Sequence, residues 1–130
     1  MIQEGIRKAE EIHVPMVLAV VDAGGNLVAY RRMKGSFLIS VDVAQGKAFS
    51  ALALNMPTHE IAKGVQPGEA IFGMHTMHGG KVVPFGGGYP LYADGELIGG
   101  FGVSGGTVEE DMLCAEYGID QTPGVARERE

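Results

Sequence analysis

The chain has 130 residues, of which 45% are hydrophobic and 20% are charged, and its formal net charge is −6. This length and composition fit one globular domain with a substantial core. The acidic balance, without a basic stripe among aromatic residues, excludes nucleic acid as an expected partner, and no apolar run approaches the ~20 residues that a helical membrane span requires.

Apolar periodicity and turn residues divide the chain into helices and strands with short connections. The expected elements, in chain order, are a helix at 2–12, a strand at 14–21, a hairpin turn at 22–26, a strand at 27–33, a helix at 40–54, a short helix at 60–65 capped by Thr58, irregular chain at 71–80, strands at 81–85, 89–93 and 96–103, and a helix at 107–117. The pattern predicts an α+β fold, in which helices pack on an antiparallel sheet. Residues 1–119 are expected to form a single domain, and the polar residues 120–130 a mobile tail.

The cysteine count and the N-terminus bear on the compartment. A single cysteine, Cys114, excludes an internal disulfide framework and fits a reducing compartment. The first residues lack the basic start and apolar core of a signal peptide. The sequence therefore predicts a cytoplasmic protein.

The glycine-rich stretch at 99–111 passes from a strand directly into a helix start. Thr107 and Glu110 have the spacing of a capping box, and acidic residues in the first turn suit the helix dipole. The amides of such a turn can hold an anion; alternatively, the glycines serve only a tight turn and close packing. No Gly-Lys-Ser/Thr follows these glycines, which excludes a P-loop.

Histidines are the candidate ligands of a cofactor. His75 and His78 lie three residues apart in a loop rich in glycine and methionine, and His59 lies in the first turn of a short helix. Cysteine or carboxylate co-ligands at zinc spacing are missing, so a structural zinc site is not expected, whereas one histidine suffices for axial ligation of haem. The alternative is that these histidines are loop and surface residues.

A nucleophile and a carboxylate clamp are the other candidate features. Ser104 lies in a Gly-x-Ser-x-Gly pattern between a strand and a helix, but no histidine follows it, as the usual order of that motif requires. Arg31 and Arg32, at the end of a strand, could bind a carboxylate or a haem propionate, or be solvated strand-end charges.

Several motifs together resemble the GlcG/HbpS-type haem-binding family. They are Val20–Leu27 (VVDAGGNL), Ala44–Ala48 (AQGKA), Phe85–Leu91 (FGGGYPL) and the stretch at 99–111. Leu54–Glu60 (LNMPTHE) is most similar to the C-terminal domain of PduO-type corrinoid adenosyltransferases and to small companion proteins of diol and glycerol utilisation. The resemblance covers residues 14–118.

The resemblance implies a profilin-like fold with a five-stranded antiparallel sheet, a homo-oligomer (tetramer or octamer), and haem binding in some members. Adenosyltransferase chemistry belongs to a separate ATP-binding domain of PduO-type proteins and is not expected here. The leading hypothesis is a small cytoplasmic oligomeric protein that binds haem or another cofactor, accessory to propanediol or glycerol utilisation. The alternatives are an enzyme, a hydrolase or isomerase of a small carboxylated metabolite, and a purely structural role for the glycine turns. The expected cofactor-binding residues are His75, His78, His59, Arg31, Arg32, Gly86, Gly87, Gly88, Ser104 and Gly105.

Overall fold

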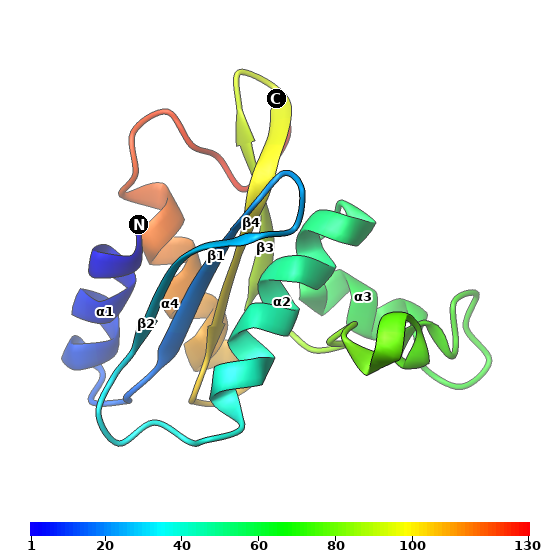
Figure 1. The fold of residues 1–130 in the computed structure, drawn as a ribbon, viewed down its shortest axis with the longest axis horizontal. Helices are drawn as coiled ribbons and strands as arrows, with labels where there is room; N and C mark the ends of the chain where they lie inside the picture. The colour runs from blue at the N-terminus through cyan, green and yellow to red at the C-terminus, as the bar shows by residue number, and fades with distance from the viewer.

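Helices cover both faces of one antiparallel sheet (Figure 1). The computed structural model describes all 130 residues. Its elements are α1 (Ile2–Glu11), β1 (Val17–Asp22), β2 (Leu27–Arg32), α2 (Ser40–Leu54), α3 (Thr58–Gly64), the 3₁₀ turns Met74–Thr76 and His78–Gly80, β3 (Gly88–Ala93), β4 (Glu96–Ser104) and α4 (Val108–Asp120). The strand order is β2-β1-β4-β3 and every neighbouring pair is antiparallel. No helix is both long enough and apolar enough to cross a membrane.

The sheet has four strands, so the prediction of five was wrong. Residues 81–85, the expected third strand, pair with no strand. The amide of Val83 instead donates to Oγ of Ser50 on α2 at 2.8 Å, and Pro84 has no N–H to contribute to a ladder. Val82 is buried against Ile61 and Val65. The apolar run at 81–85 therefore packs against helices instead of forming a strand of the sheet.

Alternation along the two central strands separates the two layers of core. On one face, Leu18 of β1 and Phe101 and Val103 of β4 pack against α1 and α4 in the largest buried cluster. On the other face, Val17, Ala19 and Val21 of β1 pack against α2, at Ala44, Ala48 and Leu52. Since successive side chains of a strand point to opposite faces, this period of two fixes the register of the sheet.

Glycines of β4 let α2 lie directly on the sheet. A Cβ atom at Gly100 would lie 2.1 Å from the carbonyl oxygen of Ala48, and one at Gly102 would lie 2.1 Å from that of Ala44. No real side chain fits these distances, so close packing requires glycine at both positions. The glycine-rich stretch therefore serves strand–helix packing at these two residues.

The helix starts follow the sequence in one case and depart from it in another. At α4, the amide of Glu110 donates to Oγ1 of Thr107 and the amide of Thr107 donates to the Glu110 carboxylate, which confirms the predicted capping box. At α3, Thr58 does not cap as predicted, because the N-cap is Pro57. The Thr58 hydroxyl is buried and accepts the amide of Gly88 at 2.8 Å, joining α3 to the start of β3.

Helix α3 and the chain that follows it project from one side of the sheet (Figure 1). This part, residues 58–80, is called the histidine lobe below because it holds three of the four histidines. Beyond α4, the backbone of Ala126 forms an isolated antiparallel bridge with Tyr92 on β3, with both N–H···O distances at 2.8 Å. The mobility of residues 120–130 stays a prediction.

Candidate functional site

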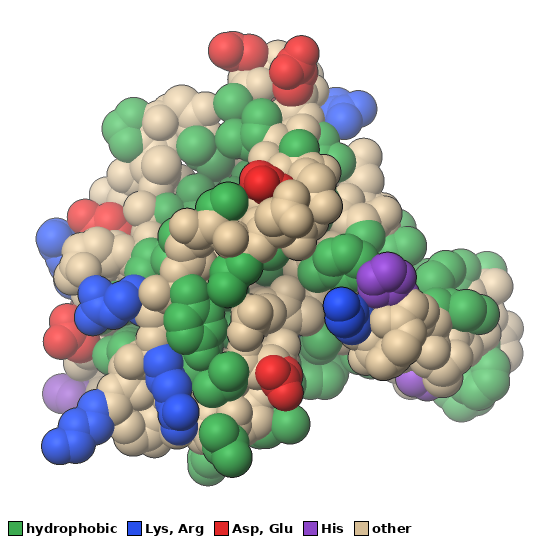
Figure 2. All heavy atoms as spheres, viewed as in Figure 1, with side chains coloured by type: hydrophobic (Ala, Val, Ile, Leu, Met, Phe, Trp, Pro, Cys, Tyr) green, Lys and Arg blue, Asp and Glu red, His purple; other side chains and the backbone are tan.

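The histidine lobe carries His59, His75 and His78, each against a different aromatic ring, whereas His13 lies exposed at the end of α1. Figure 2 shows histidine and hydrophobic side chains gathered on the lobe. Nδ1 of His59 and Nδ1 of His75 are buried and have no hydrogen-bond partner. The ring of His59 lies 5.8 Å from the ring of Tyr89 on β3. Two imidazoles of the lobe therefore keep a ring nitrogen free of internal partners.

His78 connects the lobe to the body of the protein. Its ring stacks on Phe49 of α2, with centroids 4.9 Å apart and planes inclined by 17°. The backbone of His78 has a φ of 53°, in the left-handed region that non-glycine residues seldom adopt. The stack is thus formed by a residue whose backbone is held in an uncommon conformation.

A groove of about 690 Å³ lies along α2 beside this stack. Its floor is α2, including Val43, Gly46 and Phe49; one wall is the β1–β2 hairpin around Leu27, and the other is the chain around Lys81. Ligand pockets in proteins commonly enclose about 300–1,000 Å³ and have a largely apolar lining with a few polar groups. The volume of the groove lies in this range, and 6 of its 13 lining residues are hydrophobic. Phe49 belongs to both the groove and the histidine stack.

Arg31 and Arg32 lie apart from the groove lining, at the end of the edge strand β2. Both side chains are exposed, and neither forms a salt bridge. They are consequently free to bind an anionic group from solvent, but the structure does not bring them together with the histidines.

The glycines predicted to hold an anion instead form internal hydrogen bonds or close packing contacts. The amide of Gly88 donates to Thr58, and the carbonyl of Gly87 accepts the amide of Val103. Gly86 lies against Met112, and a Cβ atom at Gly105 would lie 2.5 Å from the carbonyl oxygen of Pro15. Neither of the two main cavities is lined by these glycines.

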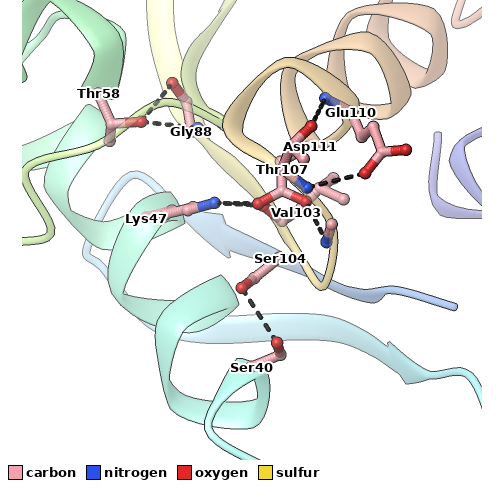
Figure 3. Close-up of polar contacts among 10 residues, drawn as sticks. Ser40, Lys47, Thr58, Gly88, Val103, Ser104, Thr107, Glu110 and Asp111 are labelled. Atoms are coloured by element: carbon pink, nitrogen blue, oxygen red, sulfur yellow. Dashed lines mark hydrogen bonds and ion pairs between the residues drawn. The ribbon is translucent and has the colours of Figure 1, made fainter. Parts of the chain in front are cut away.

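Ser104 has no catalytic partner. Its hydroxyl is buried and donates to Oγ of Ser40 at 3.2 Å, and no histidine hydrogen-bonds to it (Figure 3). A nucleophilic serine requires a base within hydrogen-bond reach. The arrangement therefore gives the predicted hydrolase or isomerase no nucleophile–base pair.

A buried ion pair that was not predicted from the sequence joins α2 to the start of α4 (Figure 3). Lys47 of α2 is 0% exposed; its Nζ donates to Asp111 Oδ2 at 2.7 Å and to the carbonyl of Val103 at 2.8 Å. Asp111 Oδ1 accepts the amide of Gly106 at 2.8 Å, and the ring of Phe85 lies 5.2 Å from Nζ. The one feature of the sequence that could have indicated this pair is Lys47 itself, a lone lysine among the small residues of α2 that face the sheet.

Burial and charge act in opposite directions on this pair. Burial lowers the pKa of Lys47 and raises the pKa of Asp111, because it disfavours the charged form of each. The opposite charge of the partner opposes both shifts. Because both side chains are buried and bonded to α2, β4 and the turn before α4, the pair is a structural tie between α2 and the start of α4.

The donor set does not form a conventional metal site. No group of three or more histidine, cysteine, aspartate or glutamate side chains lies close enough to hold a metal ion. Burial raises the pKa of the Cys114 thiol to about 12, so it stays protonated at neutral pH. The candidate site is thus a groove that one histidine of the lobe, His78, adjoins through its stack on Phe49.

Comparison with known proteins identifies the family. The family model described as "Haem degrading protein HbpS-like" matches residues 1–120. The chain belongs to the HbpS-like family. This confirms the resemblance to GlcG/HbpS-type proteins predicted from the sequence motifs.

Curated relatives of this HbpS-like chain include proteins of enteric bacteria. The corrinoid adenosyltransferase PduO of Citrobacter freundii is 46% identical over 114 residues, which are 88% of this chain and 34% of PduO. An uncharacterised 15.0 kDa protein from the dhaT–dhaS intergenic region of the same organism is 47% identical, over 87% of this chain and 80% of that protein. Protein GlcG of Escherichia coli is 30% identical, over 80% and 75%. The chain therefore spans about a third of the length of PduO.

Solved structures share the fold. A PduOC:heme complex superposes with a TM-score of 0.95 at 41% identity, covering 98% of this chain and 92% of that one. The Klebsiella pneumoniae protein ORFY gives a TM-score of 0.89 at 42% identity, covering 92% and 82%. HbpS gives a TM-score of 0.83 at 28% identity, covering 91% of this chain and 81% of HbpS. The HbpS-like chain therefore has the α+β fold of these proteins, with its four helices and four-stranded sheet.

Proposed function

We propose that this HbpS-like protein binds haem in the groove along α2, with an imidazole of the histidine lobe as an iron ligand. The observation that carries the proposal is the junction of the 690 Å³ groove with the stacked rings of Phe49 and His78. Support comes from the similarity to a protein solved as a heme complex, at 41% identity. Bound haem would supply a redox-active iron.

The residues around the groove fit such a group. Leu27, Val43 and Phe49 offer apolar contacts to a macrocycle, and Lys81 on one wall offers a positive charge to a propionate. Nδ1 of His59 and Nδ1 of His75 have no internal partner, and one of these two imidazoles is proposed as a second iron ligand, although neither lines the groove. Arg31 and Arg32, exposed and without ion pairs, are the proposed partners of a propionate that extends toward β2; they lie on opposite faces of the sheet, and Arg32, opposite Val17, is the one on the α2 face.

The assembly and cellular role are further parts of the proposal. Five large apolar side chains are exposed on β2 and the loop that follows it: Leu27, Val28, Phe37, Leu38 and Ile39. A patch of this kind supports a homo-oligomer, for which a tetramer or an octamer is proposed. A role accessory to propanediol or glycerol utilisation is proposed from the similarity to PduO. A cytoplasmic location is proposed from the single cysteine.

A hemin titration of the purified protein tests the proposal. We expect a saturable change of the Soret band, and loss of the six-coordinate spectrum in His78→Ala, with smaller effects in His59→Ala and His75→Ala. His13→Ala is the matched control, because His13 is exposed at the end of α1 and outside the lobe. A flat titration contradicts haem binding altogether. Loss of the spectrum in His13→Ala alone contradicts the placement of the ligand in the lobe.

A further inference from the structure

Three consecutive residues at the end of the histidine lobe have left-handed backbone conformations. The φ angle is 53° at His78, 67° at Gly79 and 78° at Gly80. Glycine adopts this region without strain, whereas a residue with a side chain does so at a cost in free energy. Such a conformation persists where surrounding contacts stabilise it. The side chain of His78 is therefore expected to make a contact that holds the turn in place.

That contact is the stack of the His78 imidazole on the ring of Phe49. The centroids lie 4.9 Å apart and the planes are inclined by 17°. Aromatic pairs at this separation attract one another beyond the effect of the area that they bury. The hydrogen bonds of His78 are made by its backbone, and the residue is exposed, so its ring nitrogens stay free for a ligand. The stack thus orients the imidazole without using its donor atoms.

The ring of Phe49 is itself held from a second side. A Cβ atom at Gly25, in the turn of the β1–β2 hairpin, would lie 3.4 Å from both Cδ1 and Cε1 of Phe49. Phe49 also stands on α2, whose neighbouring residues Ala48 and Ser50 are buried. Gly25 and Phe49 both line the groove. Phe49 is therefore fixed between the hairpin and the lobe, and offers His78 a surface of defined orientation at the groove.

We propose that Phe49 is a positioning residue for His78, holding the plane of this imidazole beside the groove before a ligand arrives. The inference rests on the proposed function, in which His78 is a ligand of haem iron. It assigns to Phe49 an effect that is exerted through His78, in addition to any contact with the macrocycle. A ligating ring that is already oriented loses less conformational freedom on binding, so its preorganisation contributes to affinity.

Proton NMR of the ligand-free protein tests the orientation of His78 without haem. A ring current shifts the protons of a stacked ring upfield, so the imidazole protons of His78 should resonate upfield of those of His13, which is exposed. In Phe49→Leu, which keeps an apolar side chain, they should move to the position of His13. Phe49→Tyr keeps an aromatic ring and should keep the upfield shift. Identical His78 signals in the parent and in Phe49→Leu would overturn the inference.

A double-mutant cycle with hemin tests whether Phe49 acts through His78. Phe49→Leu should lower the affinity for hemin by about two- to tenfold and reduce the six-coordinate fraction, and Phe49→Tyr should restore both. In a His78→Ala background the same change should have almost no further effect, because no imidazole is left to position. Val43→Ala removes another apolar lining contact and should lower the affinity by the same factor in both backgrounds. Phe37→Leu, an exposed phenylalanine outside the groove lining, should leave affinity and spectrum unchanged.

The two experiments separate this inference from the proposed function. Effects of Phe49→Leu and His78→Ala that add in full would overturn the positioning role and leave Phe49 as a lining residue. Saturable hemin binding with His78 signals that do not depend on Phe49 would reject the positioning role alone. A flat hemin titration of the parent with ring-current shifts that are lost in Phe49→Leu would reject haem binding and support the orientation of His78 by Phe49.

Discussion

Replacing Lys47 by methionine tests the role assigned to the buried ion pair. The substitution keeps most of the side-chain volume but leaves the Asp111 carboxylate buried, without the positive charge 2.7 Å away, and leaves the carbonyl of Val103 without its donor. Removal of one partner from a buried pair typically lowers the free energy of unfolding by about 3–5 kcal/mol. For a protein whose total stability is about 5–15 kcal/mol, this is a large fraction.

The pH dependence of the loss follows from the pKa of Asp111. Burial already raises this pKa above its ordinary value of 3.8, and Lys47 opposes the shift. In Lys47→Met that opposition is gone, so the pKa of Asp111 in the folded state rises further. The folded variant then binds a proton more readily than its unfolded chain, so its stability falls as the pH rises from about 4 through the folded-state pKa of Asp111. The destabilisation is therefore largest at neutral pH and shrinks as the solution is acidified.

Urea unfolding at fixed protein concentration, followed by circular dichroism at pH 7 and pH 5, measures both effects. Lys63→Met is the matched control, because Lys63 is exposed and its pair with Glu60 is worth about 0–1 kcal/mol. Adding Asp111→Asn to Lys47→Met should restore part of the stability, since the amide oxygen still accepts from Gly106. If Lys47→Met costs no more than Lys63→Met at pH 7, the pair is not the tie inferred here.

Three smaller changes probe the other contacts. Gly102→Ala should lower the free energy of unfolding by about 1–3 kcal/mol, because the new Cβ would lie 2.1 Å from a carbonyl oxygen of α2. In the same urea experiment, the exposed Gly24→Ala should change the free energy of unfolding by less than about 0.5 kcal/mol. Thr107→Ala should lower it by about 1 kcal/mol through loss of the capping box, visible as a lower melting temperature, and Thr107→Ser should not. Thr58→Val leaves the amide of Gly88 without an acceptor, at about 1–3 kcal/mol, and that amide should exchange with deuterium faster; unchanged exchange would contradict the bond.

Local signals in the sequence predicted most of the elements correctly. Helix α2 spans Ser40–Leu54 as expected, because its alanine-rich periodicity is uninterrupted and ends before Pro57. The capping box at Thr107 was also readable, since both partners lie within four residues. In each case, residues close together in the sequence decide the structure.

The features that the sequence analysis missed depend on long-range partners. The amide of Val83 donates to Ser50, 33 residues away, whereas the apolar residues around Val83 by themselves predict a strand. Thr58 has the position of a cap but bonds to Gly88, 30 residues away. Lys47 and Asp111 are 64 residues apart, and a lysine at the edge of a helix pattern is normally solvent-exposed. No spacing rule relates such positions.

The candidate site was predictable by residue type more than by arrangement. His59, His75 and His78 were named from the sequence, and the structure places them in one lobe. The groove along α2 was not anticipated, because it is formed by the β1–β2 hairpin and the chain around Lys81, which meet only in the folded protein. The glycines at 86–88 and 105 were expected to line a pocket, but their amides, carbonyls and Cα atoms are used in packing.

The segment at 81–85 takes no part in the sheet, so one wall of the groove is not hydrogen-bonded to any strand. It is attached to α2 by the bond from Val83 to Ser50 and by the ring of Phe85 over Lys47, and to α3 and its C-cap by the burial of Val82 against Ile61 and Val65. Releasing it would break none of the ladder bonds of the sheet, so it can open at a free energy well below that of global unfolding. Since Lys81 and Val83 form one wall of the groove, a displacement of this segment would change the width of the groove without breaking a ladder bond of the sheet.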